Sequence, residues 1–199
     1  MTNIKHLTPN ELQAGLAKIR QSPKDKGILK MIVRRPRADE REILESGELN
    51  LVEGLVGDNW RTRGSACTAA GSANPQTQLA IMNSRVIALL AQAQEHWPLA
   101  GDQLFIDLDL SAENLPPGSR LAIGSAVIEI TAQPHTGCEK FVVRFGAEAM
   151  KFVNSPLGRQ LRLRGIYAQV VQPGVIRAGD SISKIAGMSP GQGGEVEIV

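Results

Sequence analysis

The stretch that decides the fold is RLAIGSAVIEITA, residues 120–132. Two short apolar runs, 120–123 and 126–132, flank Gly124-Ser125, and this spacing is typical of a β-hairpin. Apolar side chains alternate with other residues over 103–110, which predicts a half-buried strand. Its apolar face is expected to hold Leu104, Ile106, Leu108 and Leu110.

Other short strands and a few helices surround this hairpin in the sequence. Further strands are predicted at 28–33, 78–82, 161–171, 175–176 and 181–185. Helices are predicted at 8–21, 38–45, 83–96 and, in two pieces divided at Gly146, after residue 138. Short strands separated by glycine-containing turns are typical of small β-barrels. The sequence therefore predicts a mainly-β fold, a barrel with peripheral α-helices.

The length and composition fit one sizeable domain. The chain has 199 residues, of which 42% are hydrophobic and 21% are charged, so it can bury enough apolar surface to fold as a soluble globule. We expect an N-terminal helical extension at 1–24, the barrel domain at 25–186 and a flexible C-terminal tail at 187–199. The Gly191–Gly194 run follows no β-α-β pattern and is not interpreted as a nucleotide-binding motif.

Charge and hydropathy exclude several classes of partner. The formal charge of +2 is too small for the broad basic field of general nucleic-acid binding. The longest strictly apolar run, 86–91, is far too short to cross a bilayer. Residues 1–13 lack the apolar segment of a secretory signal. We therefore expect a cytoplasmic protein without a nucleic-acid or membrane partner.

Two cysteines and three scattered histidines predict neither a disulfide framework nor a histidine-rich zinc site. Cys138 lies between a predicted strand and a predicted helix, where free backbone amides favour anions. Lys140 and Arg144 add positive charge, so the thiolate, a nucleophile and soft metal ligand, is favoured there. Gly137 permits close approach of a ligand or of another stretch of backbone. The alternative is that Cys138 is a small buried hydrophobe; Cys67 has no comparable charged setting.

Several other polar residues have two interpretations. Arg164 either holds a phosphate or carboxylate at the barrel rim or pairs with an acidic side chain, and for Arg162 pairing or exposure to solvent is favoured. The basic run at 34–37 is interpreted as solvated and partly balanced by nearby acids. His135 is too close in sequence to Cys138 for a catalytic dyad to be inferred.

The order of these signals resembles the MOSC domain, the C-terminal domain of molybdenum cofactor sulfurases, and most closely its small stand-alone bacterial members. The resemblance spans about 130 residues and rests on the segments GLVGD (54–58), GDQL (101–104), LPPG (115–118), PHTGC (134–138), RFG (144–146), RGIYA (164–168) and GVIRAGD (174–180).

The resemblance implies a β-barrel with one reactive cysteine, Cys138, beside a cofactor-sized cleft. Cys138 would bind the molybdenum of a molybdenum cofactor (molybdopterin), and basic groups would hold the pterin phosphate. The residues implied in cofactor binding are Lys140, Arg144, Arg164, His135, Thr136 and Gly137. Similar proteins reduce N-hydroxylated bases and amidoximes, so a small-molecule substrate and an electron-donor reductase are expected.

There are two alternatives to a reductase, and the resemblance implies the first of them. In the first, Cys138 carries sulfane sulfur as a persulfide, supplied by a cysteine desulfurase. Any pyridoxal phosphate would then belong to that separate partner, because this chain is too short to include a desulfurase domain. In the second, the protein is a binding module whose thiol is incidental.

Overall fold

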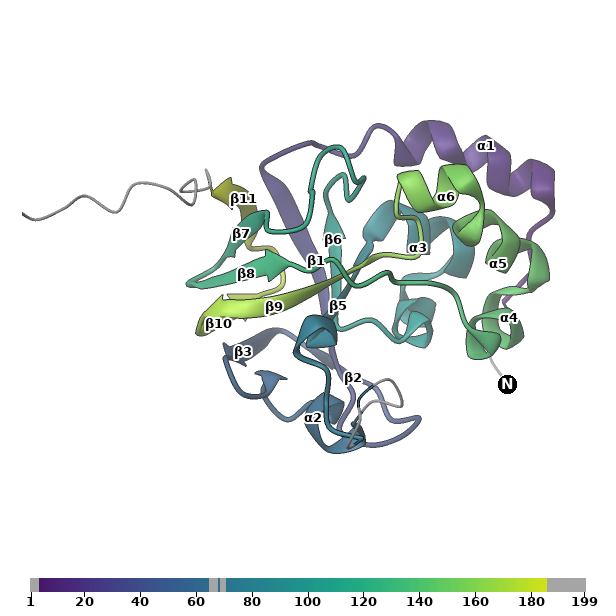
Figure 1. Cartoon of the computed structure of the whole chain (residues 1–199). Coiled ribbons are helices and arrows are strands. Elements are labelled where there is room, and N and C mark those ends of the chain that lie inside the picture. The colour runs from purple at the N-terminus through teal and green to yellow at the C-terminus, as the bar shows by residue number, and fades with distance from the viewer. Residues whose placement is uncertain (1–3, 65–67, 69–70, 186–199) are drawn as a thin grey trace, which may run out of the picture.

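The computed structural model describes residues 4–64, 68 and 71–185. Seven strands form a closed barrel in the order β11-β7-β8-β9-β5-β6-β1, and β1 pairs with β11 to close it. The strands are parallel only between β5 and β6. This closed barrel confirms the predicted fold (Figure 1). The strands are β1 (Gly27–Arg34), β5 (Leu79–Asn83), β6 (Leu104–Asp107), β7 (Arg120–Ile123), β8 (Ala126–Ile130), β9 (Ile166–Gln172) and β11 (Ser181–Ile185).

Aliphatic side chains fill the barrel. The predicted face of Leu104, Ile106, Leu108 and Leu110 belongs to this interior cluster. Phe105, on the opposite face of β6, is also fully buried, because it packs in a second cluster with the helices. The prediction of a half-buried strand was therefore wrong: helices cover the outer face of β6.

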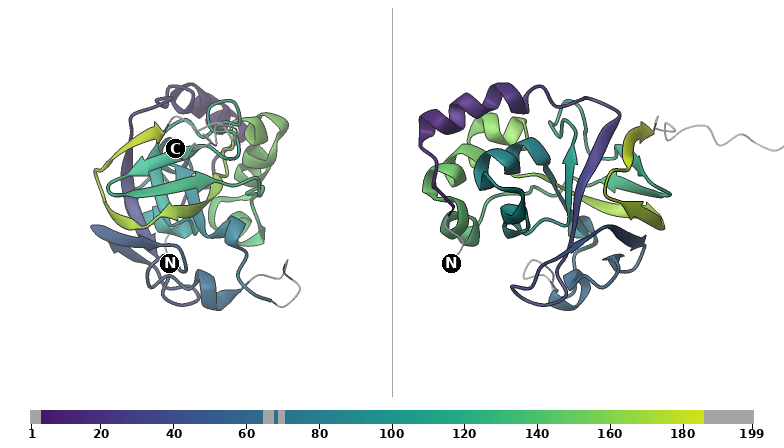
Figure 2. Two further views of the ribbon diagram at one scale, coloured as in Figure 1. Left: turned by 60° about the vertical axis from the view of Figure 1, so that its left-hand side comes forward. Right: turned by 180° about the vertical axis from the view of Figure 1, so that it is seen from behind.

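Most of the helices lie together at one end of the molecule, as the two opposite views show (Figure 1, Figure 2). The predicted first helix begins at the Thr8 cap, whose hydroxyl accepts a hydrogen bond from the amide of Glu11. No helix in the described part of the chain is long and apolar enough to span a membrane. The helices gathered at this end are α1 (Pro9–Ile19), α3 (Ser84–Ala91), the 3-10 helix η2 (Gln94–Ala100), α4 (Glu139–Phe145), α5 (Ala147–Asn154) and α6 (Pro156–Gln160).

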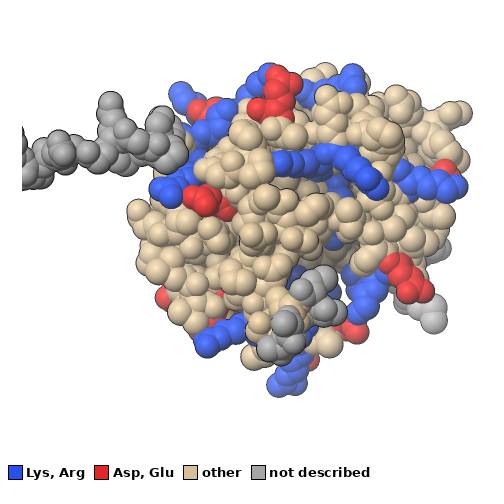
Figure 3. Space-filling model, viewed as in Figure 1, with Lys and Arg blue, Asp and Glu red and all other residues tan. Residues whose placement is uncertain are grey.

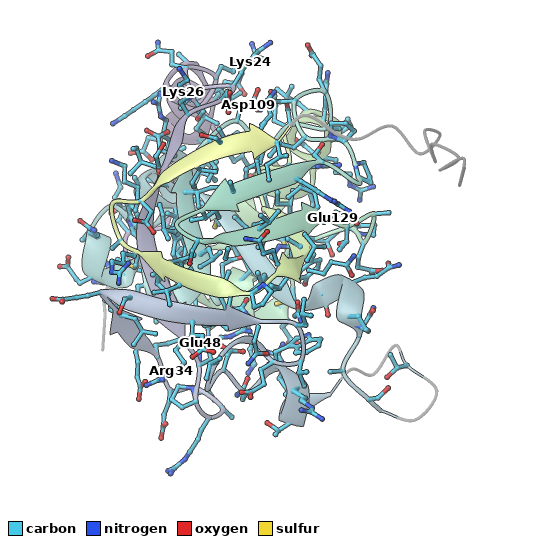
Figure 4. The ribbon with its side chains drawn as sticks, turned by 90° about the vertical axis from the view of Figure 1, so that its left-hand side faces the viewer. Lys24, Lys26, Arg34, Glu48, Asp109 and Glu129 are labelled. Carbon is cyan, nitrogen blue, oxygen red and sulfur yellow. The ribbon has the colours of Figure 1, made fainter. Side chains whose placement is uncertain are left out.

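A small second sheet lies against the barrel, in the order β10-β3-β4. Glu48 of this sheet points away from the barrel, and so does Lys24, which lies just before β1 (Figure 4). This sheet and the neighbouring segments comprise β2 (Glu42–Leu44), β3 (Ser46–Asn50), β4 (Gly54–Leu55), α2 (Trp60–Arg63), the 3-10 helix η1 (Pro75–Thr77) and β10 (Gly174–Arg177).

The segment 38–45 is not the helix that its composition predicted. Its second half forms β2, which pairs with the end of β1 and brings Arg34 opposite Glu42. Ile43 on this strand is 58% exposed. Strand pairing and the Arg34–Glu42 ion pair thus override the weak helix propensity of this segment.

The strand predicted at 161–171 begins only at Ile166. The backbone turns just before it, because Arg162 and Gly165 both have positive φ angles, 49° and 111°. A Cβ atom at Gly165 would lie 2.3 Å from the carbonyl oxygen of Ile81, so a residue without a side chain is required. Arg162 and Arg164 therefore lie in the turn before the strand and not within it.

Candidate functional site

A cleft of about 390 Å³ lies where the end of the barrel meets the helices. Cys138 and His135 line it, together with Arg and Lys side chains from several segments. Blue side chains are visible on this face of the molecule, between the positions that α2 and α4 occupy in Figure 1 (Figure 3). The cations that line the cleft are Arg35, Arg41, Arg63, Lys140, Arg144 and Arg164.

Cys138 lies at the N-terminal cap of α4, on the strand-to-helix loop that the sequence predicted. Its carbonyl accepts a hydrogen bond from the Phe141 amide at 2.9 Å, whereas its side chain makes no capping bond. The thiol is free and exposed. Cys138 is therefore not a buried hydrophobe, and its sulfur is accessible from the cleft. Cys67 lies outside the described residues.

Gly137 fixes the approach of the loop to α5. Its amide donates to Asn154 Oδ1 at 3.1 Å, and a Cβ atom there would lie 2.4 Å from Met150 Sδ. The space beside Gly137 is thus occupied by a helix. Of the two alternatives for Gly137, a ligand or another part of the protein, the structure shows close packing within the protein.

Arg35 and Asp58 form a buried pair in the wall of the cleft. The guanidinium donates to both carboxylate oxygens at 2.8 Å and to the Gly101 carbonyl at 2.8 Å. The Asp58 side chain also accepts from the backbone amides of Arg35 and Trp60. The prediction of a solvated Arg35 was wrong, while Arg34 and Arg37 do pair with acids nearer the surface.

Arg164 is paired with an acid, one of the two alternatives that the sequence left open. Its Nη1 donates to both carboxylate oxygens of Asp102, at 2.9 and 3.1 Å, and its Nη2 donates to the Ala100 carbonyl. The guanidinium also lies 5.2 Å from the centre of the Phe141 ring. Complete burial raises the pKa of Asp102, and Arg164 opposes that shift. Arg164 is therefore part of the cleft wall, with its charge already balanced.

His135 is held beside this pair. Its ring stacks on Tyr167, with 4.2 Å between the ring centres, and only 6% of its side chain is exposed. Nδ1 lies 3.6 Å from Asp102 Oδ1 and has no hydrogen-bond partner. Burial lowers the pKa of His135 well below 6.5, and the Arg164 and Arg35 cations add to this effect. His135 is therefore neutral at pH 7.

Lys140 and Arg144 lie at the more exposed side of the cleft. Both are close to Asp39, with nitrogen–oxygen distances of 3.7 and 3.8 Å, and Arg144 also donates to the Leu99 carbonyl. Thr136 lines the cleft and is exposed. The structure thus gathers every residue that the sequence predicted for the site, except that Gly137 faces α5.

The cleft and the wall behind it also contain residues that the sequence did not indicate. Asp58 and Asp102 belong to the GLVGD and GDQL segments, so the motifs could have indicated them. No local pattern indicated Arg41 or Arg63. A second cavity of about 380 Å³ shares residues 133–136 with the cleft and is bordered by Arg159 and Arg162.

The MOSC domain model matches residues 72–183, more than half of the chain. The chain belongs to the MOSC domain family. The match contains Cys138, His135 and Arg164, whereas Arg35 and the two arginines at 41 and 63 precede it. The MOSC cleft is thus completed by the segment before the matched region.

Solved structures agree with this MOSC fold. The YuaD protein from Bacillus subtilis is 16% identical, with a TM-score of 0.60, over 80% of this chain and 95% of that chain. YiiM from Escherichia coli is 18% identical, with a TM-score of 0.52, over 81% of this chain and 71% of that chain. At these identities the likeness shows the fold alone. A search of the curated proteins found no match.

The neutral His135 predicts a pH dependence of stability. The unfolded chain protonates this imidazole near pH 6.5, whereas the folded protein does so only at much lower pH. Below about pH 6.5 the unfolded state therefore binds more protons, and the free energy of unfolding falls by up to about 1.4 kcal/mol per pH unit. Urea unfolding between pH 7 and 5 should show a shallower decline for His135→Gln than for the wild type. An equal decline of the free energy of unfolding with falling pH in both proteins would contradict the assignment of His135 as a neutral, buried side chain.

Proposed function

We propose that this MOSC protein binds the molybdenum cofactor through the Cys138 thiolate and reduces small N-hydroxylated compounds. The observation that carries the proposal is an exposed thiol, free of hydrogen bonds from its own helix, that opens into a cleft lined by six cations. A thiolate is a soft ligand suited to a transition metal, and the cations suit an anionic cofactor.

The residues present fit the cofactor in two respects. The cleft volume falls within the usual range of ligand sites, roughly 300–1,000 Å³. Lys140 and Arg144 share one exposed acid, Asp39, and so retain positive charge for a phosphate. The guanidinium of Arg164, by contrast, is occupied by Asp102. We therefore assign the phosphate to Lys140 and Arg144, and to Arg164 the role of holding Asp102 and His135 in place.

When bound, the cofactor supplies two-electron redox chemistry at the metal. The protein supplies the surroundings of the sulfur. His135 and Tyr167 form a stacked wall, and burial together with Asp102 raises the pKa of the Tyr167 phenol. This phenol therefore keeps its proton at neutral pH and can donate a hydrogen bond to a bound ligand. The reductant would come from a separate electron-donor protein.

A second function, sulfur transport, is favoured by the exposure of Cys138. A partner protein can reach this thiol without any opening of the fold. The Cys138 thiolate would attack the terminal sulfur of a persulfide on a cysteine desulfurase, the partner's thiolate would leave, and Cys138 would become the persulfide. The pyridoxal phosphate of that reaction would belong to the partner.

Elemental analysis and intact mass on one preparation distinguish these functions. The protein is purified anaerobically from a host that makes the cofactor, and in parallel from a host that does not. The reductase should retain about one molybdenum per chain in the first preparation alone. A protein that holds no metal but shows a reductant-sensitive mass increase of one sulfur would favour the sulfur carrier. A protein that shows neither molybdenum nor added sulfur would favour the binding module.

A further inference from the structure

The six cations of the cleft differ in whether an acid balances them. Arg35 is paired with Asp58, and Arg164 is paired with Asp102. Lys140 and Arg144 share Asp39. For the remaining two, Arg41 and Arg63, no acidic side chain lies within 4.0 Å among the residues that the structure describes.

Arg41 is half-buried near other cations. Its Nη1 donates to the backbone carbonyl of Glu40, while its Nε is buried without a hydrogen-bond partner. Burial lowers the pKa of its guanidinium, and the neighbouring Arg144 and Arg35 add to that effect. A guanidinium keeps its proton in proteins, so Arg41 presents a poorly compensated charge to the cleft.

Arg63 reaches the same cleft from α2. Its side chain makes no hydrogen bond to any residue in the described part of the chain. Burial lowers its pKa too, and Arg35 is the cation that contributes most after burial. Arg41 is half-buried, whereas Arg63 remains exposed. Both guanidiniums lie near the Arg35 cation, and the nearby Asp58, which attracts both, is already paired with Arg35. Neither Arg41 nor Arg63 thus has an acidic partner of its own among the described residues.

We infer that Arg41 and Arg63 form an oxyanion site that holds the acidic group of a small molecule in the cleft. The planar guanidinium presents forked donors that match carboxylate, phosphate and sulfate. Two sources offer this chemistry: an acidic group on the substrate, or a phosphate on the cofactor. Lys140 and Arg144 already have charge available for the cofactor, so we assign Arg41 and Arg63 to an acidic substrate; this assignment, unlike the oxyanion site itself, rests on the proposed function.

The site can be tested by calorimetric titration of the full chain with inorganic phosphate and with sulfate. Arg41→Gln and Arg63→Gln should each weaken binding by about tenfold or more, because each removes charge-assisted hydrogen bonds. Arg61→Gln is the matched control: Arg61 lies on the same helix, is exposed and does not line the cleft. It removes the same charge and should change the affinity by less than about twofold.

The remaining outcomes are also decisive. Arg63→Lys, which keeps the charge, should retain more affinity than Arg63→Gln, and thermal unfolding of each variant verifies that it folds. No phosphate or sulfate binding by the wild type at millimolar concentration, or an equal loss in Arg61→Gln, would overturn the site.

The molybdenum and pterin contents of the purified variants show whether the acidic group belongs to a substrate or to the cofactor. Unchanged content in Arg41→Gln and Arg63→Gln would support an acidic substrate, whereas lost pterin would assign the site to the cofactor's phosphate. The titrations do not need the metal, so they stand even if Cys138 proves to carry sulfur.

Discussion

Cys138→Ser is expected to remove essentially all molybdenum from the purified protein and to prevent persulfide formation. A hydroxyl is neither a soft metal ligand nor an acceptor of sulfane sulfur. The fold should be unaffected, because the thiol is exposed and makes no capping bond. Serine is a favoured N-cap residue, so α4 should gain stability, by up to about 1 kcal/mol. Metal analysis and thermal unfolding on the same sample measure both effects.

Cys67→Ser provides the matched control for this experiment. The substitution removes the chain's other thiol and should leave the molybdenum content unchanged. Loss of metal or sulfur in Cys67→Ser, with retention in Cys138→Ser, would overturn the assignment of Cys138.

Asp58→Asn should destabilise the protein by about 3–5 kcal/mol, the usual cost of breaking a buried ion pair. The substitution keeps the size of the side chain but leaves the Arg35 guanidinium charged, buried and without its carboxylate. Asp58 also connects β1 to the start of α2, so its loss loosens that side of the cleft. The free energy of unfolding, measured with urea, tests this expectation.

The control for Asp58→Asn is Glu42→Gln, which removes the partner of the neighbouring Arg34. That pair is more exposed, so the loss should not exceed about 1 kcal/mol. The double variant Arg35→Gln/Asp58→Asn should recover part of the loss, because no unpaired charge remains. A cost below about 1 kcal/mol for Asp58→Asn would show that the pair is not important for stability.

Features specified by neighbouring residues could be predicted from the sequence. The start of the first helix depends on Thr8 and Glu11, only three residues apart, and the hairpin around Gly124-Ser125 is equally local. The break between α4 and α5 at Gly146 and the N-cap position of Cys138 followed from short patterns as well. These predictions were confirmed because each depends on contacts between residues close in sequence.

Features that depend on distant partners could not be predicted. Arg35 appears as one member of a basic run, and only folding places Asp58 at 2.8 Å from it. The segment 38–45 has helix-forming residues, yet the edge of β1 draws it into strand pairing. Arg41 and Arg63 belong to no motif, and only folding brings them into one cleft with Cys138, which lies far away in the sequence. The position of Cys138 was therefore predictable, but most of its charged surroundings were not.

Closure of the barrel has a consequence for the order of folding. β1 meets β11 through pairs such as Gly27 with Ile182, which lie almost at opposite ends of the described chain. This is a costly pairing in loop entropy, and it becomes available only when nearly the whole chain has been synthesised. Until then β7 presents an open strand edge, as does the start of β1, which β2 does not cover, and another copy of the chain could pair with either edge. When the five-residue strand β11 pairs with β1 and β7, it covers both edges. This pairing therefore ends the period in which the nascent barrel can aggregate edge to edge.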